Sequence, residues 1–180
     1  MGNAHSANLE TSLQHCLKGG KLLEITEESG KKIKTSKIDS FISSCEQVFS
    51  DSDVNNKDRS IAMAKYANLY GRKADMTSNF RFITKLELGK IAYGAVKKAL
   101  EIDPYNFEMA LAMARTVKGF YEKGAPGMVL KSVGIQDVDA EIKMAYDYLC
   151  LHMDDNQKFI EIDPKLEKEA YELYKYLGSI

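Results

Sequence analysis

Apolar side chains recur every three or four positions along nearly the whole chain, and this period limits the folds that the chain can adopt. The clearest stretch, from Ile38 to Phe49, places its apolar residues on one stripe of a helix. No segment alternates apolar and polar residues for long enough to predict a strand. The sequence therefore predicts an all-α fold with about seven to eight helices in antiparallel pairs.

Glycine and proline divide this pattern into segments. Asp103-Pro104 ends a helix that we expect from about residue 77 to residue 102, because the residue before a proline resists helical geometry. We expect Gly19-Gly20 to end the first helix, and Gly71 to cap a helix that begins near Asn56. The other predicted breaks are at Ser50, Gly124, Gly134 and Pro164.

Local signals also mark helix starts and one expected close contact. Asp137 and Asp163 each precede a helical pattern and can accept hydrogen bonds from its first turn. Gly89 and Gly94 fall inside the long helix, where each costs about 1 kcal/mol relative to alanine. We therefore expect a neighbouring helix to pack closely against them.

Composition excludes several classes of protein. Of the 180 residues, 44% are hydrophobic and 28% are charged, which is typical of a globular chain. The formal net charge is -1, so no general basic excess is present to neutralise phosphates, and nucleic-acid binding is disfavoured. The sequence holds no run of about 18 apolar residues that would predict a transmembrane helix.

A short motif occurs twice. The segments 99–104 and 159–164 share Glu-Ile-Asp-Pro before a further helical pattern. Around the first copy the chain resembles the tetratricopeptide repeat (TPR) family. Residues that resemble the second helix of one unit are Ala92, Val96, Ala99 and Pro104, and those that resemble the first helix of the next are Ala110, Met113, Ala114 and Val117.

The resemblance implies a right-handed stack of about two to three irregular helix pairs with a concave groove. It departs from the family pattern where Ala110 and Ala170 replace a large residue, and where Gly124 to Gly134 forms an insertion. Small residues let helices approach closely, so we expect Ala92 and Ala114 at a tight contact between helices.

By analogy with TPR stacks, a binding groove can be assigned to one face. Asn68, Arg72, Arg115 and Lys118 would face it, with Tyr121 nearby. We also expect the segment 123–134 to border this groove. The alternative is that these side chains are ordinary solvated polar groups of helices and that the segment is a spacer.

The sequence shows no catalytic chemistry. It lacks phosphate-binding glycine motifs, and its histidines, His5, His15 and His152, are too scattered for a zinc site. We expect no enzyme activity, no cofactor and no metal. The predicted function is a scaffold that binds a peptide or helix of a partner protein; the alternatives are a small-molecule-binding or transport-accessory protein and a lipid-anchored adaptor.

The N-terminal region, residues 1–35, is expected to be a helix followed by a polar basic segment, ahead of a helical domain over residues 36–180. Gly2 lies in the pattern M-G-x-x-x-[ST], which marks myristoylation sites. One acyl chain binds membranes weakly, so a second signal is needed. A basic cluster could supply it: Lys31, Lys32, Lys34 and Lys37. The alternative is a start processed after removal of a signal peptide.

The cysteines bear on the compartment. Cys16, Cys45 and Cys150 are odd in number and far apart, which favours three reduced core residues and a cytoplasmic protein. If the protein is exported or periplasmic instead, Cys16 and Cys45 could pair. The sequence leaves the oligomeric state open.

Overall fold

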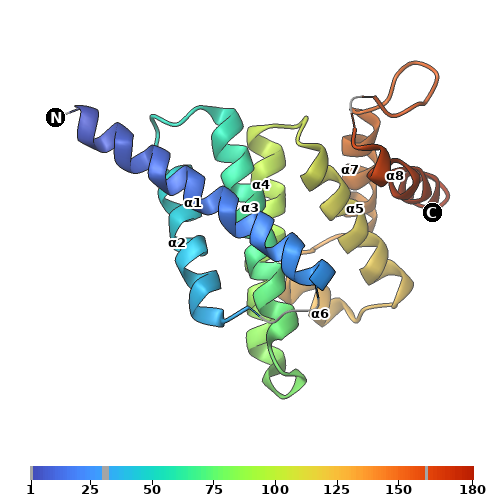
Figure 1. Ribbon diagram of the computed structural model, residues 1–180. Coiled ribbons are helices and arrows are strands. Elements are labelled where there is room, and N and C mark those ends of the chain that lie inside the picture. The colour runs from blue at the N-terminus through green and yellow to red at the C-terminus, as the bar shows by residue number, and fades with distance from the viewer. Residues whose placement is uncertain (1, 30–32, 161) are drawn as a thin grey trace.

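The computed structural model describes residues 2–29, 33–160 and 162–180, and over these residues the protein is all-α, as predicted (Figure 1). Successive helices pack side by side from α1 to α5 and again from α7 to α8, while α6 packs against α4. The helices of the described residues are α1 (Gly2–Ser29), α2 (Thr35–Ser50), α3 (Asn56–Met76), the short 3-10 helix η1 (Asn79–Arg81), α4 (Phe82–Ile102), α5 (Phe107–Glu122), α6 (Gly127–Ser132), α7 (Val138–Cys150) and α8 (Pro164–Leu177).

Helix α3 lies between two hydrophobic cores. One face of α3 carries Leu69 into a core with α1 and α2, around Phe41. The other face carries Ala67 into a larger core with α4, α5, α7 and α8, around Leu100 and Leu111. Because α3 contributes to both cores, it joins the N-terminal helices to the rest of the molecule.

The prediction that Gly19-Gly20 ends the first helix is wrong. Helix α1 runs through both residues to Ser29. A Cβ atom at Gly19 would lie 2.6 Å from Cγ of Phe41, and one at Gly20 would lie 2.6 Å from Cδ of Lys65. These glycines therefore allow α1 to approach α2 and α3 closely.

Glycines further along the chain also differ from expectation. Helix α3 continues past Gly71 to Met76, and the helix expected from residue 77 begins only at Phe82, after η1. A Cβ at Gly89 would meet Val133 at an ordinary 3.9 Å, and one at Gly94 would meet nothing within 4 Å. The close packing expected at these two positions is absent.

The helix starts that follow Asp137 and Asp163 were predicted correctly. The side chain of Asp137 accepts hydrogen bonds from the backbone of residues 139 and 140, and that of Asp163 accepts one from Lys165. Gly178 caps the end of α8. In each case the signal is local, so it does not depend on tertiary packing.

The two copies of Glu-Ile-Asp-Pro occupy different structures. The first lies at the end of α4. The second follows a turn in which Met153 and Phe159 form an isolated antiparallel bridge, the one β pairing in the described part of the chain. Asp103 caps the end of α4, and Asn106 caps the start of α5, whereas Asp163 caps the start of α8.

Cys16 and Cys45 form a disulfide bond, so the expectation of three reduced cysteines is wrong. Their Cα atoms lie 4.9 Å apart, and both residues are fully buried between α1 and α2. This spacing is within the range that a disulfide bridges. Cys150, on α7, is free.

Candidate binding groove

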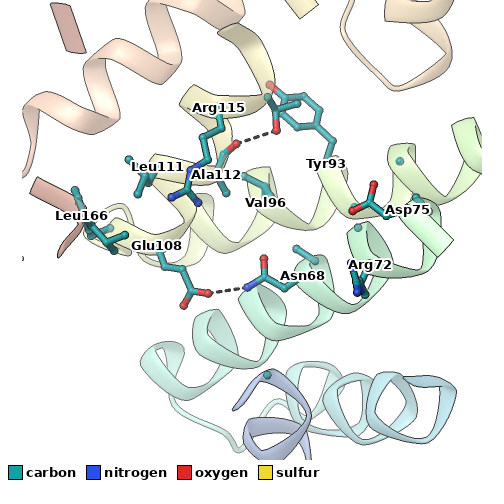
Figure 2. A pocket seen from close by; sticks show the side chains of 18 of the residues that line it. Asn68, Arg72, Asp75, Tyr93, Val96, Glu108, Leu111, Ala112, Arg115 and Leu166 are labelled. Atoms are coloured by element: carbon teal, nitrogen blue, oxygen red, sulfur yellow. Dashed lines mark hydrogen bonds between the residues drawn. The ribbon is translucent and has the colours of Figure 1, made fainter. Parts of the chain in front are cut away.

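A hollow of about 970 Å³ lies between α3, α4 and α5 and is partly open to solvent (Figure 2). We call it the groove. Leu166 and Asp163, at the start of α8, bound one end, and Val133, which follows α6, also lines it. In Figure 2 Leu166 lies at the opposite end of the view from Arg72 and Asp75.

Small residues create this space. On α3 the positions that line the groove include Ala67, Gly71 and Ala74, which recur at helical spacing. A Cβ atom added to Gly71 would meet nothing within 4 Å. On α4 and α5 the groove is lined by Ala92 and Ala112, among others. Ala92 is half-buried there and lines the groove, contrary to the tight contact that we expected, whereas Ala114 is fully buried.

A polar bridge between α3 and α5 forms one wall. Nδ2 of Asn68 donates a hydrogen bond of 2.7 Å to Oε1 of Glu108 (Figure 2). Nζ of Lys65 lies 3.0 Å from Oε2 of the same carboxylate. The charge of Glu108 is therefore balanced within the wall.

Arg115 connects α5 to α8. Its Nε donates a hydrogen bond to Oε1 of Glu169, and its Nη2 donates one to Oε2; both donor–acceptor distances are 2.5 Å. These hydrogen bonds raise the pKa of Arg115, and the guanidinium lowers the pKa of Glu169. Such bidentate pairs fix the orientation of both side chains. Arg115 therefore meets the groove as one half of an oriented ion pair, and Glu169 balances its charge.

Arg72 and Asp75 lie one turn apart on α3 and both line the groove. Asp75 is exposed, and within the described residues its carboxylate has no hydrogen-bond or ion-pair partner. A guanidinium and a carboxylate one turn apart can contact the carbonyl and the amide groups, respectively, of a bound chain.

Tyr93 lines the groove from α4 and is buried. Its hydroxyl donates a 2.7 Å hydrogen bond to Oε2 of Glu141 on α7, and Nζ of Lys97 lies 2.6 Å from Oε1 of that carboxylate. Burial, followed by the bond to Glu141, raises the pKa of Tyr93. The hydroxyl is therefore a structural donor and is not poised to act as a base.

The structure brings together three of the predicted site residues and separates the others. Asn68, Arg72 and Arg115 line the groove. Lys118 instead lies over the ring of Tyr176 on α8, with Nζ 4.9 Å from its centroid. Tyr121 also faces Tyr176, with ring centroids 6.5 Å apart. Neither lines the groove.

Two further predictions concern chain segments. Of the segment 123–134, Val133 lines the groove, while Met128 is exposed and not covered as we expected. Gly2 begins α1 and does not line the groove. Lys31 and Lys32 lie outside the described residues.

Sequence reasoning missed Glu108, Thr116 and Asp75 as groove residues. The helical spacing of these residues in the sequence could have indicated them. Residues 68, 72 and 75 are separated by four and three positions, as are 108, 112 and 115, so each set shares one face of its helix.

Features of other site types are absent from the part of the chain that the structure describes. No group of His, Cys, Asp or Glu residues there could hold a metal ion. Burial raises the pKa of the free thiol of Cys150, which disfavours its reactive thiolate form. No described helix is both long and apolar enough to cross a membrane.

Comparison with known protein families, with curated proteins and with solved structures finds no match.

Proposed function

We propose that this chain is a non-enzymatic TPR-like interaction module that holds a peptide or helix of a partner protein in the groove. The observation that carries the proposal is the groove itself, an open hollow of about 970 Å³ on three adjacent helices. Binding surfaces on stacked helix pairs are typically of this kind.

The chemistry of the groove suits a peptide. Alanine, valine and leucine positions offer an apolar surface for one or two side chains. Asp75 and Arg72 supply an acceptor and donors at one end. Arg115, held by Glu169, supplies an oriented polar side chain along the same path. Polar groups at the edge of an apolar surface fix the orientation and register of what binds.

The TPR-like assignment rests on antiparallel neighbours and on the small residues of α4 and α5. Ala99, Ala110 and Ala114 are fully buried where α4 and α5 belong to the larger core. This is the role that small residues have in TPR pairs. On this proposal α3 with α4 forms one unit, and α5 begins the next.

A small-molecule or transport-accessory role is the second candidate. The observation that favours it is the start of α8, where Asp163 and Leu166 bound one end of the groove. The volume of the groove also lies within the range of about 300–1,000 Å³ that is usual for small-ligand sites. A metabolite could therefore occupy the groove in place of a peptide.

Peptide selection followed by mapping tests the proposal. The full chain is used to select binders from a random displayed peptide library, and backbone amide shifts are then recorded with the enriched peptide. We expect the shifts to concentrate on α3, α4 and α5. Peptides that shift other helices, or a selection without enrichment, would contradict a peptide-binding groove.

The same protein can be screened against small metabolites by thermal unfolding. A metabolite that raises the unfolding midpoint and shifts the same amides, while no peptide does, would establish the second candidate instead.

A further inference from the structure

The connection between α3 and α4 exposes large apolar side chains that the groove does not use. Phe80 is fully exposed, Ile83 is 72% exposed and Phe82 is 54% exposed. Met76, at the end of α3, is 40% exposed. We call residues 76–86 the tip. Contiguous exposed apolar groups of this size mark interaction sites.

The tip projects from the body of the molecule. Figure 1 shows the α3–α4 connection as the lowest part of the ribbon, below the ends of α2 and α6. None of Phe80, Phe82 and Ile83 lines the groove or either of the smaller hollows on α7 and α8. With the exposed fractions given above, these side chains project outward from the α3–α4 connection.

Positive charge surrounds these side chains. Between Met76 and Leu86 the chain has two cations, Arg81 and Lys85, and no carboxylate. Within the described residues neither cation forms an ion pair. The nearest acidic residues along the chain are Asp75, which lines the groove, and Glu87.

The first turn of α2 adds further cations at the same end. Nζ of Lys73 lies 2.7 Å from Oδ1 of Asp39, which places the start of α2 beside the last turns of α3. Lys34 and Lys37 are exposed there, and no partner for either is recorded within the described residues. The pair between Lys73 and Asp39 is neutral. The four cations Lys34, Lys37, Arg81 and Lys85 outnumber the two flanking carboxylates, Asp75 and Glu87, so the net charge of these groups is positive.

We infer that the tip is a peripheral membrane-docking element: Phe80, Phe82 and Ile83 insert into the interface of an anionic lipid surface, while Arg81, Lys85, Lys34 and Lys37 contact its headgroups. Projecting apolar side chains insert into a fluid interface without needing a preformed pocket. The surrounding cations complement anionic lipids. The site does not depend on the proposed peptide groove, which Asp75 and Arg72 line from the adjacent turns of α3.

This surface is distinct from an acyl group on Gly2. Gly2 and Ser29 are the ends of the 28-residue helix α1. At about 1.5 Å per residue the two ends are about 42 Å apart. In Figure 1 the tip lies toward the C-terminal end of α1 and far from the N-terminus. Lipid on Gly2 and the lysines at the start of α2 would therefore contact different regions of a membrane.

A single tryptophan tests insertion directly, because the chain contains none. Phe80→Trp in the full chain is mixed with phosphatidylcholine vesicles that contain about 30% phosphatidylglycerol. We expect its emission to shift to shorter wavelength and to be quenched by brominated acyl chains. Met128→Trp, on exposed α6, is the matched control and should show neither effect.

Binding strength separates the apolar and charged contributions. Phe80→Ser with Ile83→Ser should weaken vesicle binding by about tenfold or more, since large apolar groups lose their insertion energy. The double variant Lys37→Glu and Arg81→Glu should weaken binding to anionic vesicles by at least about fivefold for each residue replaced. Its binding to vesicles of phosphatidylcholine alone, which is weak, should not change.

Two results would overturn the inference. One is an emission spectrum of Phe80→Trp that does not change with either the anionic or the neutral vesicles. The other is an emission shift that depends on protein concentration and not on lipid, which would show that a second copy of the chain covers the tip. Because Phe80 makes no buried contact, the tryptophan variant remains informative even if the serine variants lower stability.

Discussion

Glycines of this chain act in two different ways. The Cβ of an alanine at position 19 would lie 2.6 Å from the ring of Phe41, whereas at position 94 it would enter open space. Gly19→Ala should therefore lower the free energy of unfolding by about 1–3 kcal/mol through overpacking. Gly94→Ala should raise it by up to about 1 kcal/mol through helix propensity. Urea unfolding followed by circular dichroism measures both, and changes of the same sign would contradict this account.

His152 is a buried group whose protonation should affect stability. Its side chain lies against Phe107, with ring centroids 5.0 Å apart, and its Nε2 has no hydrogen-bond partner among the residues that the structure describes. Burial lowers the pKa of His152 from its usual 6.5, and the Asp103 carboxylate partly opposes this. The unfolded chain therefore binds a proton more readily than the folded one, so stability should fall as the pH drops below about 6.5.

His152→Phe removes this proton-binding group and keeps an aromatic ring beside Phe107. We expect the variant to lose less stability than the wild type between about pH 7 and pH 5. Denaturant unfolding at a series of pH values gives, for each of the two proteins, the slope of the free energy of unfolding against pH. Equal slopes would show that His152 does not contribute to acid sensitivity.

At the scale of the helices, a covalent link joins α1 to α2. The disulfide joins Cys16 of α1 to Cys45 of α2, and 29 positions separate the two residues. Closing a loop of this length in the unfolded chain stabilises the folded state by about 3–4 kcal/mol in the chain-entropy model. Reduction should lower the free energy of unfolding by that amount, measured on the Cys150→Ala variant so that disulfide exchange does not intervene.

Hydrogen exchange can localise the effect of reduction. We expect the amides of α1 to lose protection first, while those of α5 and α7, in the larger core, keep theirs. Equal unfolding curves for oxidised and reduced protein would contradict a stabilising role. We propose that the chain folds in an oxidising compartment, since disulfides persist there.

The accuracy of sequence reasoning depended on whether a signal was local. The caps at Asp137 and Asp163 could be predicted because each bonds within its own first turn. The role of Gly19 could not, because it is determined by Phe41 on another helix. The disulfide could be raised only as an alternative, since its formation requires α1 and α2 to meet at one register.

The groove was partly predictable for the same reason. Asn68 and Arg72 are assigned to a groove by the analogy with TPR stacks, and both line the groove. Lys118 was assigned to the same groove as Arg115, but α8 packs beside it, and Lys118 contacts Tyr176 there. The position of α8 follows from long-range packing, which helical periodicity does not encode.

For the molecule as a whole, α3 connects the two cores, lines the groove and ends at the tip. The proposed peptide and membrane surfaces therefore share one helix while using different residues of it. Variants of the tip should leave peptide affinity within about twofold of the wild-type value, because they remove no groove contact. Calorimetric titration of the Phe80→Ser and Ile83→Ser double variant checks this independence, and a large loss of affinity would show that the two surfaces are coupled.

The central claim is that the hollow between α3, α4 and α5 is a binding site, and two leucine substitutions test it most directly. Gly71 and Gly94 are both helical glycines with open space around the Cβ position, but only Gly71 lines the groove. The measurement is the calorimetric affinity of a peptide selected on the wild-type chain for Gly71→Leu and Gly94→Leu. We predict that Gly71→Leu weakens binding by at least about tenfold, which is about 1.4 kcal/mol, and that Gly94→Leu leaves it unchanged. Equal affinity of the two variants for the peptide would contradict the account.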